Sequence, residues 1–319
     1  MAIILLSVVI ICSSWGFFVH KTTHQLAIYQ LPQPLRDYFY KNIDYLEFNA
    51  VRPDVRIKKD RTEGPKHYIN LERYGSIAAM PQHWNDAVKK YSKDTLFKYG
   101  YLPYWIIEIQ RRLTVAFKQE NTDSILFYAA DLGHYIEDAN VPLHTTLNYD
   151  GQLTDQKGLH ALWESTIPEI NKKYYNFFSP HKATYIKNKE VIVWAAIQKA
   201  HAILPAIFAK EEAITSHFTD AEKYRVQYRK GKEVKTYSTA FAKAYATALG
   251  NTINQQLIIS SNMVADFWYT AWVDAGKPDI SKFSKSSLND VEKMQLNKEM
   301  ESFKNNRLIN DGYLRAAKK

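Results

Sequence analysis

One stretch of the sequence, from His134 to Glu164, carries histidines and carboxylates at helical spacing. His134 and Asp138 are four residues apart, and so are His160 and Glu164. Residues four apart share one face of a helix, so each pair sets an imidazole beside a carboxylate. His144 stands between the pairs, after a Pro-Leu dipeptide. A fold for this chain has to satisfy all five side chains, and that requirement constrains it more than any other feature.

This pattern predicts a metal site. Imidazole nitrogen and carboxylate oxygen are donors that proteins offer to Zn²⁺, at about 2.0 to 2.2 Å. Five donors in one stretch exceed what a single ion needs, which favours more than one ion. A lone pair such as His134 and Asp138 has an ordinary alternative, because histidine and aspartate also pair on solvated faces or at a core edge. Two pairs with an intervening histidine favour the metal site.

The sequence predicts one large, mainly helical domain. Its 319 residues are 46% hydrophobic and 14% aromatic, enough for a full core, and no Gly/Ser-rich or Pro-rich linker divides them. Gly100 and Pro103 are predicted to interrupt the first helical region. Apolar residues recur at helical spacing over four segments: residues 81–118, 123–139, 191–215 and 239–272.

Two further segments and the charge leave alternatives open. Residues 224–238 alternate tyrosine, valine and basic side chains and predict a small hairpin, which could touch a polyanion or be a solvated excursion. Residues 281–319 predict a loosely packed polar helix or a tail. The net charge of +9 suits polyanionic substrates or surfaces, but dispersed lysines also serve only to keep a surface soluble. Five histidines fit no ligand spacing and are predicted to be structural: His24, His83, His181, His201 and His217.

The first fourteen residues predict a secretory signal. An apolar run from Ala2 to Cys12, too short to cross a bilayer, is followed by small residues. The usual basic segment before this run is missing, which suggests a truncated start. Cleavage after Ser14 would remove the only cysteine and leave Trp15 at the N-terminus of a secreted or periplasmic protein without a transmembrane segment. Lipidation of Cys12 is the alternative, disfavoured because Ile11 stands where lipoprotein signals prefer a small residue.

Trp15 and Gly16 with His20 shortly after, together with the HxxxD, Pro-Leu-His and HxxWE segments, resemble a known superfamily. It is that of the trinuclear-zinc phosphodiesterases, which contains bacterial zinc-dependent phospholipases C and secreted single-strand-specific nucleases. The resemblance covers residues 15–164 and implies an all-α fold of the phospholipase C/nuclease type with a metal cleft. The expected limits are residues 1–14 for the signal, 15–280 for the phosphodiesterase domain and 281–319 for the helix or tail.

The resemblance implies three zinc ions. Asp138 would bridge the first two of them. Asp60 is a rival to Asp54 because it is nearer to His67 in the sequence, and Asp54 itself could be an ordinary turn residue. The implied ligands form three sets: Trp15, through its amino group and carbonyl, His20 and Asp138; Asp54, His67, His134 and Asp138; and His144, His160 and Glu164.

The resemblance also implies contacts with substrate. Tyr68 stands where relatives carry an aromatic ring that stacks on a base or packs beside a lipid headgroup, although a core tyrosine is an equal alternative. Asn70 stands where the nucleases carry an acidic residue that reads the base edge. Arg56 is the basic residue nearest to a phosphate-binding position, but its spacing is off by one.

We therefore expect a zinc-dependent phosphoric diester hydrolase, foremost a nuclease or nucleotidase for single-stranded DNA or RNA. A metal-activated water would attack phosphorus, and Asp54 would orient or deprotonate it. A phospholipase C acting on phosphatidylcholine-like lipids is the alternative, favoured by Glu164 in place of an aspartate. A zinc-bearing protein that binds lipid or nucleic acid without turnover is the second alternative. No protein partner is predicted.

Overall fold

The computed structural model describes residues 16–229 and 232–317. Over these residues the chain is mainly helical, with one two-stranded antiparallel hairpin. The predicted fold class, a mainly helical domain with a small hairpin, is confirmed. The predicted signal segment and Trp15 lie outside the described residues.

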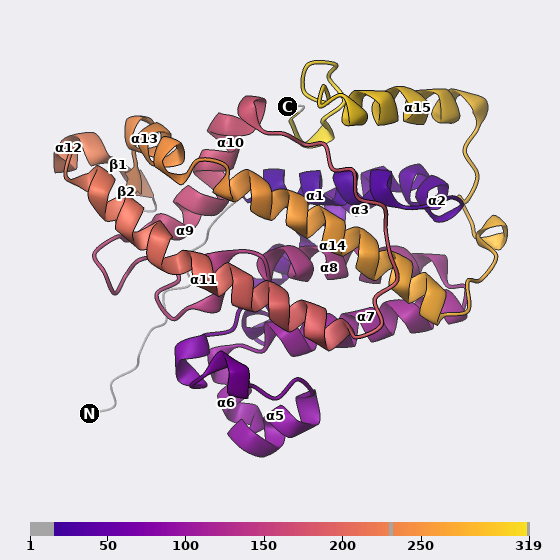
Figure 1. Cartoon of the computed structure of the whole chain (residues 1–319), viewed down its shortest axis with the longest axis horizontal. Coiled ribbons are helices and arrows are strands. Elements are labelled where there is room, and N and C mark those ends of the chain that lie inside the picture. Colours follow the sequence, from indigo (N-terminus) through magenta and orange to yellow (C-terminus); the bar gives the residue numbers. More distant parts are fainter. Residues whose placement is uncertain (1–15, 230–231, 318–319) are drawn as a thin grey trace.

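The described residues form fifteen α-helices and two strands, with several short 3₁₀ turns between them. Figure 1 shows their arrangement. The helices are α1 (Phe17–Gln30), α2 (Leu35–Lys41), α3 (Ile43–Asn49), α4 (Arg52–Ile57), α5 (Trp84–Tyr91), α6 (Lys93–Tyr99), α7 (Leu102–Lys118), α8 (Thr122–Asp138), α9 (Leu159–Ala161), α10 (Ile167–Asn171), α11 (Lys189–Thr215), α12 (Asp220–Lys223), α13 (Thr239–Leu249), α14 (Thr252–Asp274) and α15 (Asp290–Lys304). The strands are β1 (Tyr224–Arg229) and β2 (Lys232–Tyr237), paired from Tyr224 with Tyr237 to Arg229 with Lys232.

The core forms where α1, α7, α8 and α14 meet, with α14 packed against the other three (Figure 1). Trp268 of α14 is fully buried, stacks on Phe39 at 4.8 Å between ring centroids, and donates its indole N–H to the carbonyl of Ala129 on α8. Every residue of α8 from Ala129 to Asp138 is buried. The polar side chains in that half of α8 must therefore find partners inside the protein.

Close approach of α1 to α8 depends on Gly133. A Cβ atom at this position would lie 2.5 Å from Nε2 of His24 on α1, so a larger residue would push the two helices apart. This contact fixes the spacing between α1, which carries His20, and α8, which carries His134. Two of the predicted ligands thus lie on helices that touch.

Two predicted segments differ from the structure. Residues 239–272 form two helices instead of one, because Gly250 adopts a positive φ of 60° and ends α13. Within residues 281–317, Asp290–Lys304 forms a helix, one of the two predicted alternatives, but this helix is packed against the core rather than loose. On α15, Leu296 and Phe303 are buried and Glu299 accepts a hydrogen bond of 2.7 Å from the Tyr29 hydroxyl.

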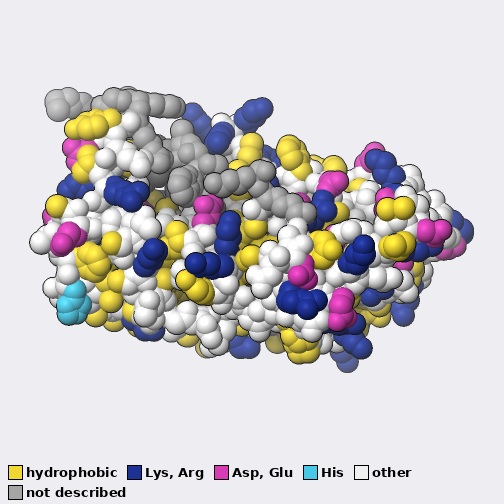
Figure 2. Space-filling view, turned by 90° about the horizontal axis from the view of Figure 1, so that it is seen from above, with side chains coloured by type: hydrophobic (Ala, Val, Ile, Leu, Met, Phe, Trp, Pro, Cys, Tyr) yellow, Lys and Arg dark blue, Asp and Glu magenta, His cyan; other side chains and the backbone are white. Residues whose placement is uncertain are grey.

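Helix α11 is long and apolar enough, by length and composition, to cross a membrane, a property that core helices share. It packs against α7 and α13 in the structure. Positive charge is dispersed on the face shown in Figure 2, where lysines and arginines are scattered among acidic and apolar side chains. This face shows no single basic patch.

Candidate metal centre

Three groups of histidine and carboxylate side chains could each hold a metal ion within the described part of the chain. The ligand atoms within each group lie within 4.8 Å of one another. All the predicted ligands except Trp15, which lies outside the described residues, belong to these groups. The first group is His20, His134 and Asp138; the second is Asp54, His67 and His134; the third is His144, His160 and Glu164.

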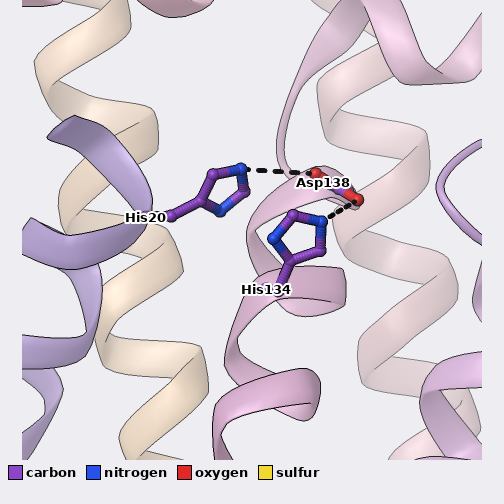
Figure 3. Close-up of side chains that lie close together, drawn as sticks. All are labelled: His20, His134 and Asp138. Atoms are coloured by element: carbon purple, nitrogen blue, oxygen red, sulfur yellow. Dashed lines mark ion pairs between the residues drawn. The ribbon is translucent and has the colours of Figure 1, made fainter. Parts of the chain in front are cut away.

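Asp138 links the first two groups. The imidazoles of His20, from α1, and His134, from α8, converge on its carboxylate (Figure 3). Nε2 of His20 lies 3.9 Å from Oδ1 of Asp138, and Nε2 of His134 lies 3.4 Å from Oδ2. The two rings stack with centroids 4.1 Å apart. Since its two oxygens face different imidazoles, Asp138 has the geometry of a carboxylate that bridges two ions.

His67 and Asp54 complete the second group from outside α8. Nδ1 of His67 lies 3.0 Å from Oδ2 of Asp138 and 3.7 Å from Oδ1 of Asp54. Nε2 of His134 lies 3.6 Å from the same Asp54 oxygen. Asp60, in contrast, is not in any of the three groups and accepts hydrogen bonds from the backbone N–H and hydroxyl of Thr62. The structure therefore places Asp54, and not Asp60, with the histidines.

In the third group, two histidines face the two oxygens of one carboxylate. Nε2 of His160 lies 2.9 Å from one oxygen of Glu164, and Nε2 of His144 lies 2.8 Å from the other. The second contact lacks hydrogen-bond geometry, and the buried His144 Nε2 has no hydrogen-bond partner among the described residues. Imidazole nitrogen and carboxylate oxygen are both zinc donors, so the three side chains of this group could hold one ion.

His160 and Glu164 lie across a local widening of the helix. Residues Leu162–Thr166 form a π-helical turn between α9 and α10. Pro168 has no N–H to donate to the carbonyl of Glu164 four residues earlier, which removes one α-helical hydrogen bond at this turn. Such π-turns are frequent at functional sites. The four-residue spacing predicts the pair but not the widened turn.

The opposite ring nitrogens of three histidines are held by backbone carbonyls. Nδ1 of His134 lies 2.8 Å from the carbonyl oxygen of Ala50, and Nδ1 of His160 lies 3.2 Å from that of Tyr149. Nδ1 of His144 contacts the carbonyl of His67. Because a carbonyl only accepts, Nδ1 carries a proton in each ring, and Nε2 is the nitrogen left to face a metal.

Electrostatics favour the protonation states that bind metal for His134, a neutral imidazole, and for Glu164, an ionised carboxylate. Burial and the neighbouring His20 and His67 lower the pKa of His134 well below its usual range, so its imidazole is neutral. Burial opposes ionisation of Glu164, but the His160 and His144 imidazoles outweigh it and lower the pKa of this carboxyl well below its usual range. His144 is the opposite case: despite burial, nearby Asp138 and Glu164 raise its pKa to about 10. A metal ion that binds His144 must displace its proton.

Arg56, the predicted phosphate contact, is held by carboxylates next to the centre. Its Nη2 lies 2.9 Å from Oε1 of Glu63 and 2.8 Å from Oδ2 of Asp131. Both carboxylates are buried, and Glu63 also lies 3.7 Å from Nε2 of His67. Arg56 therefore neutralises buried charge behind the histidines. Glu63 is four residues before His67, but Gly64 and Pro65 between them are typical of a loop, where this spacing does not predict a shared helix face.

Tyr68 lies half-buried near the third group. Burial and the nearby Tyr149 raise the pKa of the Tyr68 hydroxyl. Tyr149 is 46% exposed, and its ring makes a T-shaped contact with the His160 ring, with 6.2 Å between centroids. Gly100, with φ of +90°, makes room for Tyr68, since a Cβ there would lie 2.2 Å from the Tyr68 carbonyl oxygen. Asn70 is only 8% exposed, which leaves little of it for a base to contact.

The histidines predicted to be structural lie outside the three groups. His24 is fully buried, its ring nitrogens lie 2.8 Å from the carbonyl oxygen of His20 and 3.1 Å from that of Ala130, and burial lowers its pKa to about 4. His181 pairs with Asp266 at 2.8 Å, far along the chain from any predicted ligand. Neither residue shares a carboxylate with the metal groups.

Comparison of the chain with protein-family models and with curated proteins gives no match. What the fold and site define is a mainly helical protein with three adjacent His/carboxylate groups. Its function is therefore inferred from the chemistry of these groups.

Proposed function

We propose that this protein is a zinc-dependent phosphodiester hydrolase that cleaves single-stranded DNA or RNA, of the trinuclear-zinc type that its sequence resembles. The observation that carries the proposal is Asp138, whose Oδ1 faces His20 of the first group and whose Oδ2 faces His67 of the second. A third group, with no residue in common with these two, completes the set. Several ions close together suit a substrate on which negative charge develops at more than one oxygen.

Bound zinc would lower the pKa of water and stabilise negative charge on phosphoryl oxygens. The side chain of Asp54 is 38% exposed, compared with 3% for Asp138 and 19% for Glu164. Solvent therefore reaches Asp54 more readily than the other two carboxylates. We assign to Asp54 the orientation of the attacking water and the acceptance of its proton.

The first group needs ligands beyond His20, His134 and Asp138, because His134 and Asp138 also face the second group. Gly16 lies beside the centre, because it lines one pocket with His20 of the first group and Glu164 of the third. Export followed by cleavage after Ser14 would create an amino terminus one residue before Gly16. This supports the proposal that the amino group and carbonyl of Trp15 complete the first group.

Tyr68 and Tyr149 support a nucleic-acid substrate. Both lie near the third group, and aromatic stacking on a base contributes about 1 to 3 kcal/mol. The net charge of +9 also suits a polyanion. A phospholipase C is the second candidate, favoured by exposed apolar side chains on the loop before His160, such as Leu153 at 63% exposure.

Hydrolysis assays on the purified protein beginning at Trp15 test the proposal. Three substrates are tested: single-stranded RNA, single-stranded DNA and phosphatidylcholine vesicles. Hydrolysis of each is measured without EDTA, in the presence of EDTA, and after zinc has been added back. Zinc-restorable cleavage of nucleic acid alone is the expected result. Release of phosphocholine would establish the phospholipase instead. Zinc binding without turnover of any of these substrates would favour the non-catalytic alternative.

A further inference from the structure

Glu137 is a buried carboxylate directly before Asp138 on α8, and sequence analysis did not select it. Its side chain is 4% exposed and its Oε2 lies 2.9 Å from Nδ1 of His20 on α1. Within the described residues, no lysine or arginine forms an ion pair with Glu137, and its Oε2 has no aligned hydrogen-bond partner. A buried carboxylate without a cation is costly, so this one calls for an explanation.

His20 lies between two carboxylates. Its Nε2 faces Asp138 and the first metal group, while its Nδ1 faces Glu137. The stacked ring of His134 at 4.1 Å restricts the His20 ring on one side. His20 can thus present one nitrogen to a metal while the other lies within reach of a carboxylate.

Glu137 differs from the groups behind three of the other histidine ligands, whereas His67, like His20, has a carboxylate at its second nitrogen, Glu63 at 3.7 Å. His134, His144 and His160 have neutral backbone carbonyls at their second nitrogen. A carboxylate in that position accepts the ring proton more strongly, fixes which nitrogen is protonated and makes the other nitrogen a better donor. Glu137 also lines a narrow pocket with Gly16, His20 and Glu164.

We propose that Glu137 is a positioning residue that orients His20 toward the first metal ion and raises the affinity of that site. The inference rests on the proposed zinc centre, but it concerns a residue outside the ligand set. Loss of such a partner typically lowers metal affinity about 10- to 100-fold. We expect this loss for one of the three ions, with the other two unaffected.

The test compares Glu137→Gln with the unaltered protein and with Glu299→Gln. Glu299 is a matched control because it is equally buried but lies on α15 and binds Tyr29 and Gln295. Competition with a chromophoric chelator measures the zinc affinities. The absorption spectrum of the cobalt-substituted protein reports ligand geometry independently of activity. Glu137→Gln should weaken one ion about 10-fold or more and alter the cobalt spectrum, while Glu299→Gln should change neither.

Glu137→Asp keeps the charge and should recover part of the affinity, which also covers the case in which Glu137→Gln does not fold. Zinc affinity and cobalt spectrum both unchanged in Glu137→Gln would overturn the inference while leaving the zinc centre intact. Equal losses in Glu137→Gln and Glu299→Gln would also overturn it, because they would show a general effect of removing a buried charge. If the unaltered protein bound no zinc, the proposed function itself would fail.

Discussion

Replacement of Asp138 by asparagine tests the centre most directly. An amide has no charge and offers one oxygen, so it cannot bridge two ions as a carboxylate does. Asp138 lies within 3.9 Å of imidazole nitrogens from both the first and the second groups. The third group has no residue in common with these two groups. The structure therefore predicts that Asp138→Asn lowers the zinc content from about three ions per chain to about one and reduces hydrolysis to background.

Metal analysis after dialysis against zinc-free buffer measures the ions retained, and circular dichroism checks that the helices persist. Asp266→Asn is the matched control, because Asp266 also pairs with a histidine, His181, at 2.8 Å but lies outside the three groups. The converse variant, Glu164→Gln, should lose only the third ion. An active Asp138→Asn protein that keeps three zinc ions would refute the assignment of Asp138 as the bridge.

Three further predictions concern the surroundings of the centre. Tyr68→Ala should raise KM for an oligonucleotide about 5- to 150-fold at unchanged zinc content, which corresponds to about 1 to 3 kcal/mol of lost stacking. An unchanged KM in steady-state assays would exclude the stacking role. Arg56→Ala should lower the free energy of unfolding in urea by about 3 kcal/mol, since it takes a cation away from two buried carboxylates, Glu63 and Asp131; an unchanged stability with a raised KM would instead favour its predicted phosphate contact. Zinc affinity should rise as the pH increases from about 6 to about 9. Hydrogen bonds and charges from carboxylates outweigh burial and raise the pKa of His67 to about 9 and that of His144 to about 10, so zinc displaces fewer protons as the pH rises. An affinity independent of pH in chelator competition would contradict this prediction.

Local sequence patterns predict the parts of the centre that lie on single elements. The helix α8, the spacing of His134 from Asp138 and the hairpin all follow from periodicity within a short window. Glu137 could not be selected in this way, because its partner His20 is more than a hundred residues earlier in the chain. The packing of α15 was missed for a related reason: its few buried residues, such as Leu296 and Phe303, are too sparse to mark an apolar face.

The balance of charge at the centre favours an anionic substrate over a neutral one. Asp54, Glu137, Asp138 and Glu164 all face histidines, and no described lysine or arginine forms an ion pair with any of these four carboxylates. With neutral imidazoles, these four negative charges would lie buried or half-buried without compensation, which is costly. Three divalent ions would bring six positive charges and leave an excess of two. The negative charge of a phosphodiester increases as water attacks, so it would compensate this positive excess most fully in the transition state. Stabilisation of the transition state more than of the bound substrate accelerates the reaction.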